Sequence, residues 1–346
     1  MRIIRPDINI DFIRKQKLGF IFSAMAILIC LCSLIIQKGP NYGIDFIGGT
    51  IVQIKFSEAV TIGKIRDGLS SIKLKDVSVQ EFGQKQYNEY LIRTSNSESG
   101  DHNLSAILAA AIKKSTGVTP EIRRVEMVGP QVGSELRKKA LLAIFYALLF
   151  ITIYISYRFE QKLLLSGVTS GGLMTAVYFL SVFEVSMAFL ITAALIITLI
   201  LFWILRLKYA MGAIVALLHD VLITVGIFSV LNLDFSLPII AALLTIIGYS
   251  LNDTIIVFDR IRENIKGVKT PETIPLLFNK SINETLSRTI LTSLTTLIVL
   301  FALFFLGGEI IHNFAFAMII GVLTGTYSSI FVASPIVLLA NKGQIK

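Results

Sequence analysis

The chain has 346 residues, of which 54% are hydrophobic and 16% charged, and its mean hydropathy is +0.75. A soluble domain of this size needs more polar surface, and several uncharged runs of about 18 residues or more are long enough to cross a bilayer. The net charge is +9, but the basic residues lie mostly in short loops at one end of the apolar runs, as in oriented membrane proteins. These features predict a polytopic α-helical membrane protein and argue against a nucleic-acid partner.

The chain begins with a basic segment, residues 1–17, in which Arg14, Lys15 and Lys17 precede the apolar run 18–36. This run resembles a signal peptide, but it is longer than a typical signal-peptide core and no small-x-small cleavage site follows it. We therefore expect an uncleaved transmembrane helix at 18–36, with residues 1–17 in the cytoplasm.

A polar segment, residues 37–138, follows the first span. Alternating apolar residues predict strands, and helical spacing predicts helices, in the order 51–56, 61–74 (helix), 77–82, 89–94, 103–114 (helix) and 121–128. The order βαββαβ is that of an α+β ferredoxin-like domain, which by itself assigns no activity. The segment has no metal-ligand cluster and no catalytic triad, so we expect no metal site, no cofactor and no enzymatic reaction.

The rest of the chain is predicted to lie in the membrane. A second span at 139–158 precedes a C-terminal bundle, 208–346, of four apolar runs at 209–231, 236–258, 282–306 and 314–340. The charged segment 259–280 is expected to be a cytoplasmic loop, and the capping-box pattern Ser281 to Glu284 to begin the helix after it. The positive-inside rule then places the ferredoxin-like domain, between the first two spans, outside the cytoplasm.

An additional apolar segment, residues 161–207, consists of two uncharged runs separated by Glu184. Basic residues flank the segment at both ends and basic loops stay inside, so it must cross the membrane an even number of times. We predict an inserted hairpin of two spans with Glu184 outside, which makes eight spans in total. Glycines in the first run leave a re-entrant or interfacial segment, and six spans, as the alternative.

Three ionisable residues are predicted within the membrane: Asp220, Asp253 and Arg288. An Asp at the centre of a membrane helix costs about 2.5 to 3.5 kcal/mol to insert, so such residues should face protein. Asp253 and Arg288 lie near the inner ends of consecutive antiparallel spans, where we expect them to face each other. His219 precedes Asp220, and because neighbouring helical residues diverge by about 100° we expect it only to pack.

Three interpretations of the Asp253–Arg288 pair are open. In the first, the pair has only a structural role and fixes the helix register. In the second, Asp253 loads and unloads a proton beside Arg288, with help from Asp220. In the third, the acids bind a metal or Na⁺ ion. We adopt the proton relay. Polar or small residues expected to support helix packing are Asn252, Thr254, Thr292, Ser293, Gly321 and Gly325.

Six ordered motifs, at 41–50, 128–133, 216–221, 248–260, 283–293 and 325–329, resemble those of the SecD/SecF family, a branch of the RND superfamily, and within it the SecF subunits. The resemblance covers about residues 1–160 and 208–346. The insert 161–207 departs from the family, which typically has six spans.

The resemblance implies a SecF-like accessory subunit of the Sec export machinery in the bacterial inner membrane. Such a subunit acts with a SecD-like subunit beside SecYEG and couples the proton-motive force to the translocation of secretory polypeptides. It places Asp253 and Arg288 at positions that the family associates with proton conduction. Residues matching the family's signature loop, which we expect to shape the attachment of the outer domain, are Gly43, Asp45, Gly48 and Gly49.

Two alternative functions are a passive assembly subunit that conducts no protons and a small-molecule transporter of the RND type. Transporters of that type usually carry two large outer domains and about twelve spans, which this chain lacks.

Overall fold

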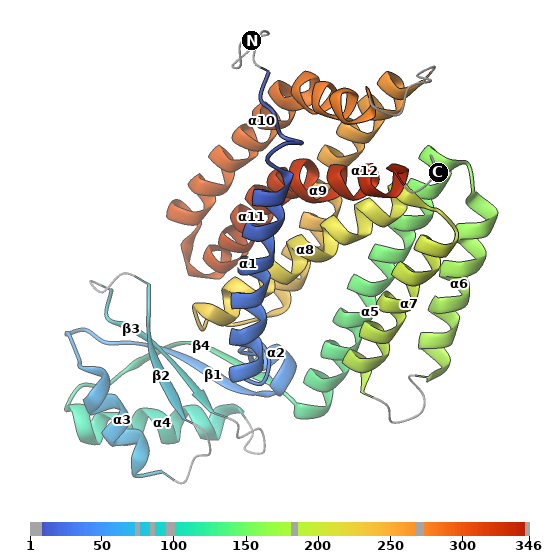
Figure 1. The fold of residues 1–346 in the computed structure, drawn as a ribbon. Helices are drawn as coiled ribbons and strands as arrows, with labels where there is room; N and C mark the ends of the chain where they lie inside the picture. The colour runs from blue at the N-terminus through green and yellow to red at the C-terminus, as the bar shows by residue number, and fades with distance from the viewer. Residues whose placement is uncertain are drawn as a thin grey trace.

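The computed structural model describes residues 9–72, 77–83, 87–94, 101–180, 186–266 and 273–342. A small sheet domain lies at one end of a bundle of long helices, and α1 begins and α12 ends at the opposite end (Figure 1). We call these the domain end and the terminal end of the bundle.

The sheet domain contains six elements: β1 (Gly49–Lys55), α3 (Ile62–Ser70), β2 (Ser78–Phe82), β3 (Glu89–Thr94), α4 (Asp101–Thr116) and β4 (Glu121–Val128). The strands form one sheet in the order β2-β3-β1-β4, and all three neighbouring pairs are antiparallel. Alternate residues of β1, Val52 and Ile54, pack with Ile65 of α3 and Leu108 of α4 in a common core. The elements follow the expected order. In each strand or helix the apolar residues recur at a spacing that places them on one side, and this side packs into the core.

The bundle contains α1 (Gln16–Ile36), α5 (Pro130–Ile155) with a π-helical end η2 (Ser156–Glu160), α6 (Leu163–Leu180), α7 (Met187–Ile204), α8 (Lys208–Val230), α9 (Leu237–Ile265), α10 (Ile274–Leu306), α11 (Gly308–Ser328), η4 (Ser329–Ala333) and α12 (Ser334–Lys342). Seven helices within the described ranges are long and apolar enough to cross a membrane. The prediction of a polytopic helical membrane protein is confirmed.

The predicted hairpin 161–207 folds as the separate helices α6 and α7, which lie beside α5 at the edge of the bundle (Figure 1). Helix α6 is among the seven candidate spans, whereas the apolar stretch of α7, Phe189–Ile204, is shorter. Leu180 and Met187, the facing ends of the two helices, are separated by residues that include Glu184, which lies outside the described residues. A total of eight spans therefore stays a prediction.

Two helices begin earlier than predicted. Helix α5 begins at Pro130 rather than 139, and α10 begins at Ile274 rather than 282, because each has a proline in its first turn, where the missing N–H has no cost. The expected capping role of Ser281 is wrong. Its hydroxyl lies within α10 and donates to the Leu277 carbonyl at 2.7 Å.

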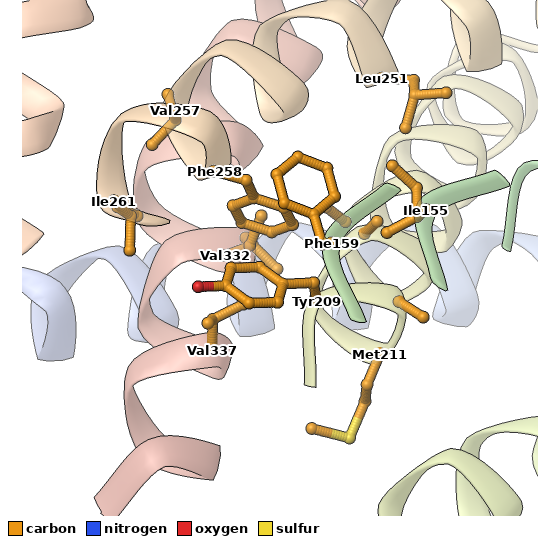
Figure 2. Packing of buried hydrophobic residues seen from close by; sticks show 14 of the residues in the cluster. Ile155, Phe159, Tyr209, Met211, Leu251, Val257, Phe258, Ile261, Val332 and Val337 are labelled. Atoms are coloured by element: carbon orange, nitrogen blue, oxygen red, sulfur yellow. The ribbon is translucent and has the colours of Figure 1, made fainter. Parts of the chain in front are cut away.

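An aromatic cluster joins the two ends of the inserted segment at the terminal end of the bundle. The Phe159 ring stacks on Tyr209 with centroids 5.1 Å apart, and Phe258 of α9 lies 5.3 Å from Tyr209 (Figure 2). The backbone N–H of Tyr209 also donates to Glu160 at 2.9 Å. Because the residues on either side of the insert are fixed to each other, α6 and α7 extend from the bundle without interrupting its core.

Close helix packing depends on three glycines at two helix crossings. A Cβ atom added at Gly226 of α8 would overlap Cys30 of α1. On α11, a Cβ at Gly321 would overlap Ile246, and one at Gly325 would lie 2.8 Å from the Ser250 Cβ. The small residues thus let α8 approach α1 and α11 approach α9 closely, as in other membrane helix pairs.

We expect Gly226→Ala to lower the free energy of unfolding by roughly 1 to 3 kcal/mol, the usual cost of overpacking a core, because the methyl group would overlap Cys30. Thermal unfolding in detergent measures the effect. Gly171→Ala on α6 is the matched control, since a Cβ there meets nothing within 4 Å. Equal stability of the two variants would contradict this account of the α1–α8 contact.

Candidate functional site

Asp253 lies in the interior of the bundle, 1% exposed, where α9, α10 and α11 meet. Its Oδ2 atom accepts one long hydrogen bond, 3.4 Å, from the Ser293 hydroxyl of α10. Ser293 is itself 2.6 Å from the Thr326 hydroxyl of α11. The other carboxyl oxygen, Oδ1, is buried and has no hydrogen-bond partner among the described residues. Within the described residues, hydrogen bonding therefore holds only one of the two carboxyl oxygens of Asp253.

Two more buried polar atoms near Asp253 have no partner within the described part of the chain. They are the hydroxyl oxygens of Thr254 on α9 and Thr289 on α10. A buried polar group without a hydrogen bond costs about 1 to 3 kcal/mol, so such groups are uncommon in folded proteins. The polar atoms around Asp253 keep a capacity for hydrogen bonding that the protein fold leaves unused.

Arg288 does not make the expected direct contact with Asp253, although its charge lies near enough to act on the Asp253 carboxyl group. Its residue is exposed on the outer surface of α10, and no ion pair among the described residues joins it to Asp253. The reason is helical geometry: Ser293 faces Asp253, and a residue five positions earlier points roughly 140° away. Asn252, expected to support the site, is likewise exposed, on the outer surface of α9.

Asp220 of α8 is fully buried and has partners on several helices. Its Oδ2 atom accepts hydrogen bonds from Ser250 of α9 at 2.6 Å and from Ser328 of α11 at 2.8 Å. Its Oδ1 atom lies 2.9 Å from Nδ1 of His219. The expectation that His219 only packs is wrong, because its side chain turns back along the helix toward the neighbouring carboxylate.

His219 continues this network to the first helix. Its Nε2 atom is 3.1 Å from the Ser23 hydroxyl of α1, and Ser23 donates to the Tyr327 hydroxyl of α11 at 3.2 Å. Tyr327 in turn donates to the Gly19 carbonyl of α1 at 2.7 Å. Asp220 and His219 thus connect α1, α8, α9 and α11 through one continuous hydrogen-bond network that is buried at Asp220 and partly buried at Tyr327.

The signature loop attaches the sheet domain to the start of α9. Asp45, in the short helix α2 (Ile44–Ile47), accepts a hydrogen bond from the Leu237 N–H at 2.9 Å. Gly43 N–H donates to the Phe235 carbonyl at 2.8 Å. The carboxylate of Asp45 caps the first turn of α9, where the helix dipole favours a negative charge. The sequence motif had given no partner for Asp45.

Two glycines of the loop are required by the backbone. Gly48 and Gly49 have φ angles of +83° and +129°, a region that favours glycine. A Cβ at Gly48 would lie 2.6 Å from the Cα of Pro130, at the start of α5. The loop therefore fits against α5 only without side chains at this point.

Tyr42 lies between this loop and α5, with the Arg137 guanidinium 5.5 Å from its ring centroid. Burial raises the pKa of the Tyr42 phenol, and the positive charge of Arg137 opposes that rise.

An ion pair that the sequence did not indicate adds to this attachment. Arg93 of β3 donates through Nη1 to Asp234 at 2.6 Å and through Nη2 to the second carboxyl oxygen. Asp234 lies in the link between α8 and α9, 141 positions away in the chain. No local pattern signals a pair of this separation. The link 231–236 is thus bound to the sheet domain by backbone, helix-cap and ionic contacts together.

Comparison with known families agrees with this arrangement. The family "Protein export membrane protein SecD/SecF, C-terminal" matches residues 108–188 and 180–343, and the SecD/SecF GG motif matches residues 33–60. The protein translocase subunit SecF of Calditerrivibrio nitroreducens is 42% identical over 344 residues, 98% of this chain and 96% of the relative. SecF of Vibrio alginolyticus is 39% identical, over 97% of this chain and 91% of the relative.

The solved structures include two with the same fold. The crystal structure of SecDF, a translocon-associated membrane protein from Thermus thermophilus, matches with a TM-score of 0.70 and 31% identity, over 98% of this chain and 40% of that chain. SecDF in its super-membrane-facing form matches with a TM-score of 0.60. The chain is a membrane protein of the protein-export class by fold. It belongs to the SecF branch of the SecD/SecF family.

We expect Arg93→Ala and Asp234→Ala each to weaken the attachment of the sheet domain, because either change leaves the other partly buried charge unpaired. The double variant should be little worse than either single one, which gives a coupling free energy of about 0.5 to 3 kcal/mol. Hydrogen exchange of the amides of 231–236 and thermal unfolding measure it.

Arg123→Ala is the control for this cycle, since Arg123 pairs with Glu121 on the exposed strand β4. An exposed pair of this kind contributes about 0 to 1 kcal/mol. Strictly additive effects of Arg93→Ala and Asp234→Ala would contradict the coupling.

Proposed function

We propose that this chain is an accessory subunit of the Sec protein-export machinery that works with a SecD-like subunit to couple the proton-motive force to polypeptide translocation. The observation that carries the proposal is that Asp253, buried and held on one side only, is part of the helix whose outer end is fixed to the sheet domain. The SecF relatives and the SecDF structures support the same conclusion.

The two buried aspartates suit different roles. Asp220 has its oxygens occupied by Ser250, Ser328 and His219, so a change of protonation would disrupt a network joining four helices. Asp253 accepts one long hydrogen bond, and its other oxygen has no partner within the described ranges. A proton can therefore be gained or lost at Asp253 with little rearrangement of other bonds. We assign proton loading to Asp253, and a structural and supporting role to Asp220.

Helix α9 offers a direct path from Asp253 to the outer domain. It is a continuous helix of 29 residues that begins at Leu237, whose N–H is bound by Asp45. Asp253 lies sixteen positions later, or roughly 24 Å along the axis at the usual rise per residue. A shift or tilt of this helix on protonation would reach the sheet domain through Asp45 and through the ion pair of Asp234 with Arg93.

The position of Arg288 supports a partner subunit. An exposed guanidinium on an apolar span costs several kcal/mol in hydrocarbon, and the neighbouring face of α9 exposes the polar Asn252. On the same face α9 exposes small residues at helical spacing: Ala241, Thr245 and Gly248. Small residues permit close helix approach in membranes, so this face of α9 and α10 suits a second helical bundle. In SecDF, the matching region is 40% of a longer chain.

We place the protein in the bacterial inner membrane with its N-terminus in the cytoplasm and its sheet domain, a ferredoxin-like module, outside. There the domain would act with the SecD-like subunit on secretory polypeptides as they leave SecYEG, without an enzymatic reaction of its own. Proton release and uptake at Asp253 would involve Arg288 once the partner covers the exposed face and encloses both residues.

We expect Asp253→Asn to keep assembly with the SecD-like subunit but to abolish proton-dependent stimulation of export in inverted membrane vesicles, because the amide cannot release a proton. Asp259→Asn is the matched control on α9, since Asp259 lies near the helix end in an exposed ion pair with Arg158. Unchanged stimulation in Asp253→Asn would favour a passive assembly subunit.

We expect Gly248→Cys on α9 to form cross-links with the copurified SecD-like subunit, because it lies on the proposed contact face with nothing within 4 Å. Thr175→Cys, exposed on α6 at the edge of the bundle, is the control and should give no such product. A short reagent with one thiol-reactive and one photoreactive end, followed by denaturing gels, separates the two results. Cross-linking through Thr175→Cys alone would place the partner on the inserted helices instead.

A further inference from the structure

A pocket of about 220 Å³ lies at the terminal end of the bundle, where the inserted segment rejoins the core. Trp203 and Arg206, at the end of α7, form one wall, and Lys208 and Met211 of α8 form another. Leu339 of α12 closes the pocket. Figure 2 shows Met211 pointing away from the aromatic cluster of Phe159, Tyr209 and Phe258. The pocket thus combines two basic side chains with an apolar floor.

Arg206 occupies a backbone position that favours glycine. Its φ is +55°, and α7 ends there through hydrogen bonds from Leu207 N–H to the Phe202 carbonyl at 2.9 Å and from Arg206 N–H to the Trp203 carbonyl at 3.3 Å. Glycine is the usual residue at this place in such a helix end, and another residue costs about 1 to 2 kcal/mol. The guanidinium makes no ion pair within the described part of the chain. The way in which α7 ends therefore does not explain why position 206 is an arginine rather than a glycine.

The opposite wall of the pocket also carries donors. The Lys208 ammonium contacts the Oδ1 atom of Asn341, whose Nδ2 atom is buried without a partner in the described residues. The adjacent acid, Glu160, is bound to the Tyr209 N–H and does not line the pocket. The pocket lining therefore carries cationic groups and no carboxylate.

An exposed apolar surface extends from the pocket along α7. Trp203 and Ile204 are each 66% exposed, and Ile200 is 53% exposed, at the end of an apolar helix. Tryptophan is enriched at the boundary between lipid tails and headgroups. The basic side chains beside it are thus placed at headgroup depth, with an apolar surface for hydrocarbon chains next to them.

We propose that this pocket binds the phosphate-bearing headgroup of an anionic phospholipid, in the leaflet that the charge distribution predicts to be cytoplasmic. Arg206 and Lys208 bind the phosphate oxygens, Trp203 lies against the glycerol region, and the acyl chains follow the exposed face of α7. Basic pockets between membrane helices on this side recognise such headgroups. The inserted segment supplies Trp203 and Arg206, so the proposal gives the insert a function that is independent of proton coupling.

The chain contains a single tryptophan, Trp203, so its fluorescence reports on this pocket alone. We expect brominated phosphatidylglycerol to quench Trp203 in the purified full-length protein at lower mole fraction than brominated phosphatidylcholine. Arg206→Gly should weaken this preference about fivefold, since one basic residue near the surface contributes roughly 1 kcal/mol. Glycine suits the positive φ, so this variant should fold at least as stably as the parent chain.

Three comparisons complete the experiment. Arg206→Lys should keep most of the preference, and Lys15→Gln, which removes an exposed charge before α1, should leave it unchanged. Excess soluble glycerol phosphate should not relieve the quenching by phosphatidylglycerol; if it does, the pocket takes free phosphate and the lipid proposal fails. Equal quenching by both lipids, or an unaltered preference in Arg206→Gly, would also overturn it.

Discussion

A carboxyl group buried among membrane helices needs hydrogen-bond donors from the protein or a proton of its own, because hydrocarbon supplies neither. The two buried aspartates meet this constraint differently. Asp220 accepts hydrogen bonds from Ser250 and Ser328, contacts His219, and connects α8 to its neighbours. Asp253 accepts one long hydrogen bond from Ser293, and its second oxygen has no partner among the described residues. One acid thus joins the helices of the bundle, and the other is the one to which we assign proton exchange.

Helix α9 links this chemistry to the sheet domain. The C-terminal half of α9 carries Asp253, and the first turn of α9 is capped by Asp45 of the signature loop. The ion pair between Arg93 and Asp234 holds the preceding link at the same place. The domain is consequently attached to the helix that carries Asp253, and the proposed coupling uses this attachment to connect proton exchange with motion of the domain.

The insert adds to this architecture without changing it. Its two ends are fixed by the contact of Phe159 with Tyr209, so α6 and α7 pack on the outside of α5. Phe202 and Leu207 of the insert join the main hydrophobic core, and the additional surface provides the basic pocket at Arg206.

The sequence by itself determined the elements: alternation predicted the strands of the sheet domain, long uncharged runs predicted the spans, and the motifs indicated the family. These signals are local, since period and length depend on neighbouring residues only. Only the tertiary structure decided which side chains meet. Arg288 points outward and His219 binds Asp220 because rotation of whole helices sets their direction. The ion pair of Arg93 with Asp234 joins residues far apart in the chain, and no local pattern encodes such a contact.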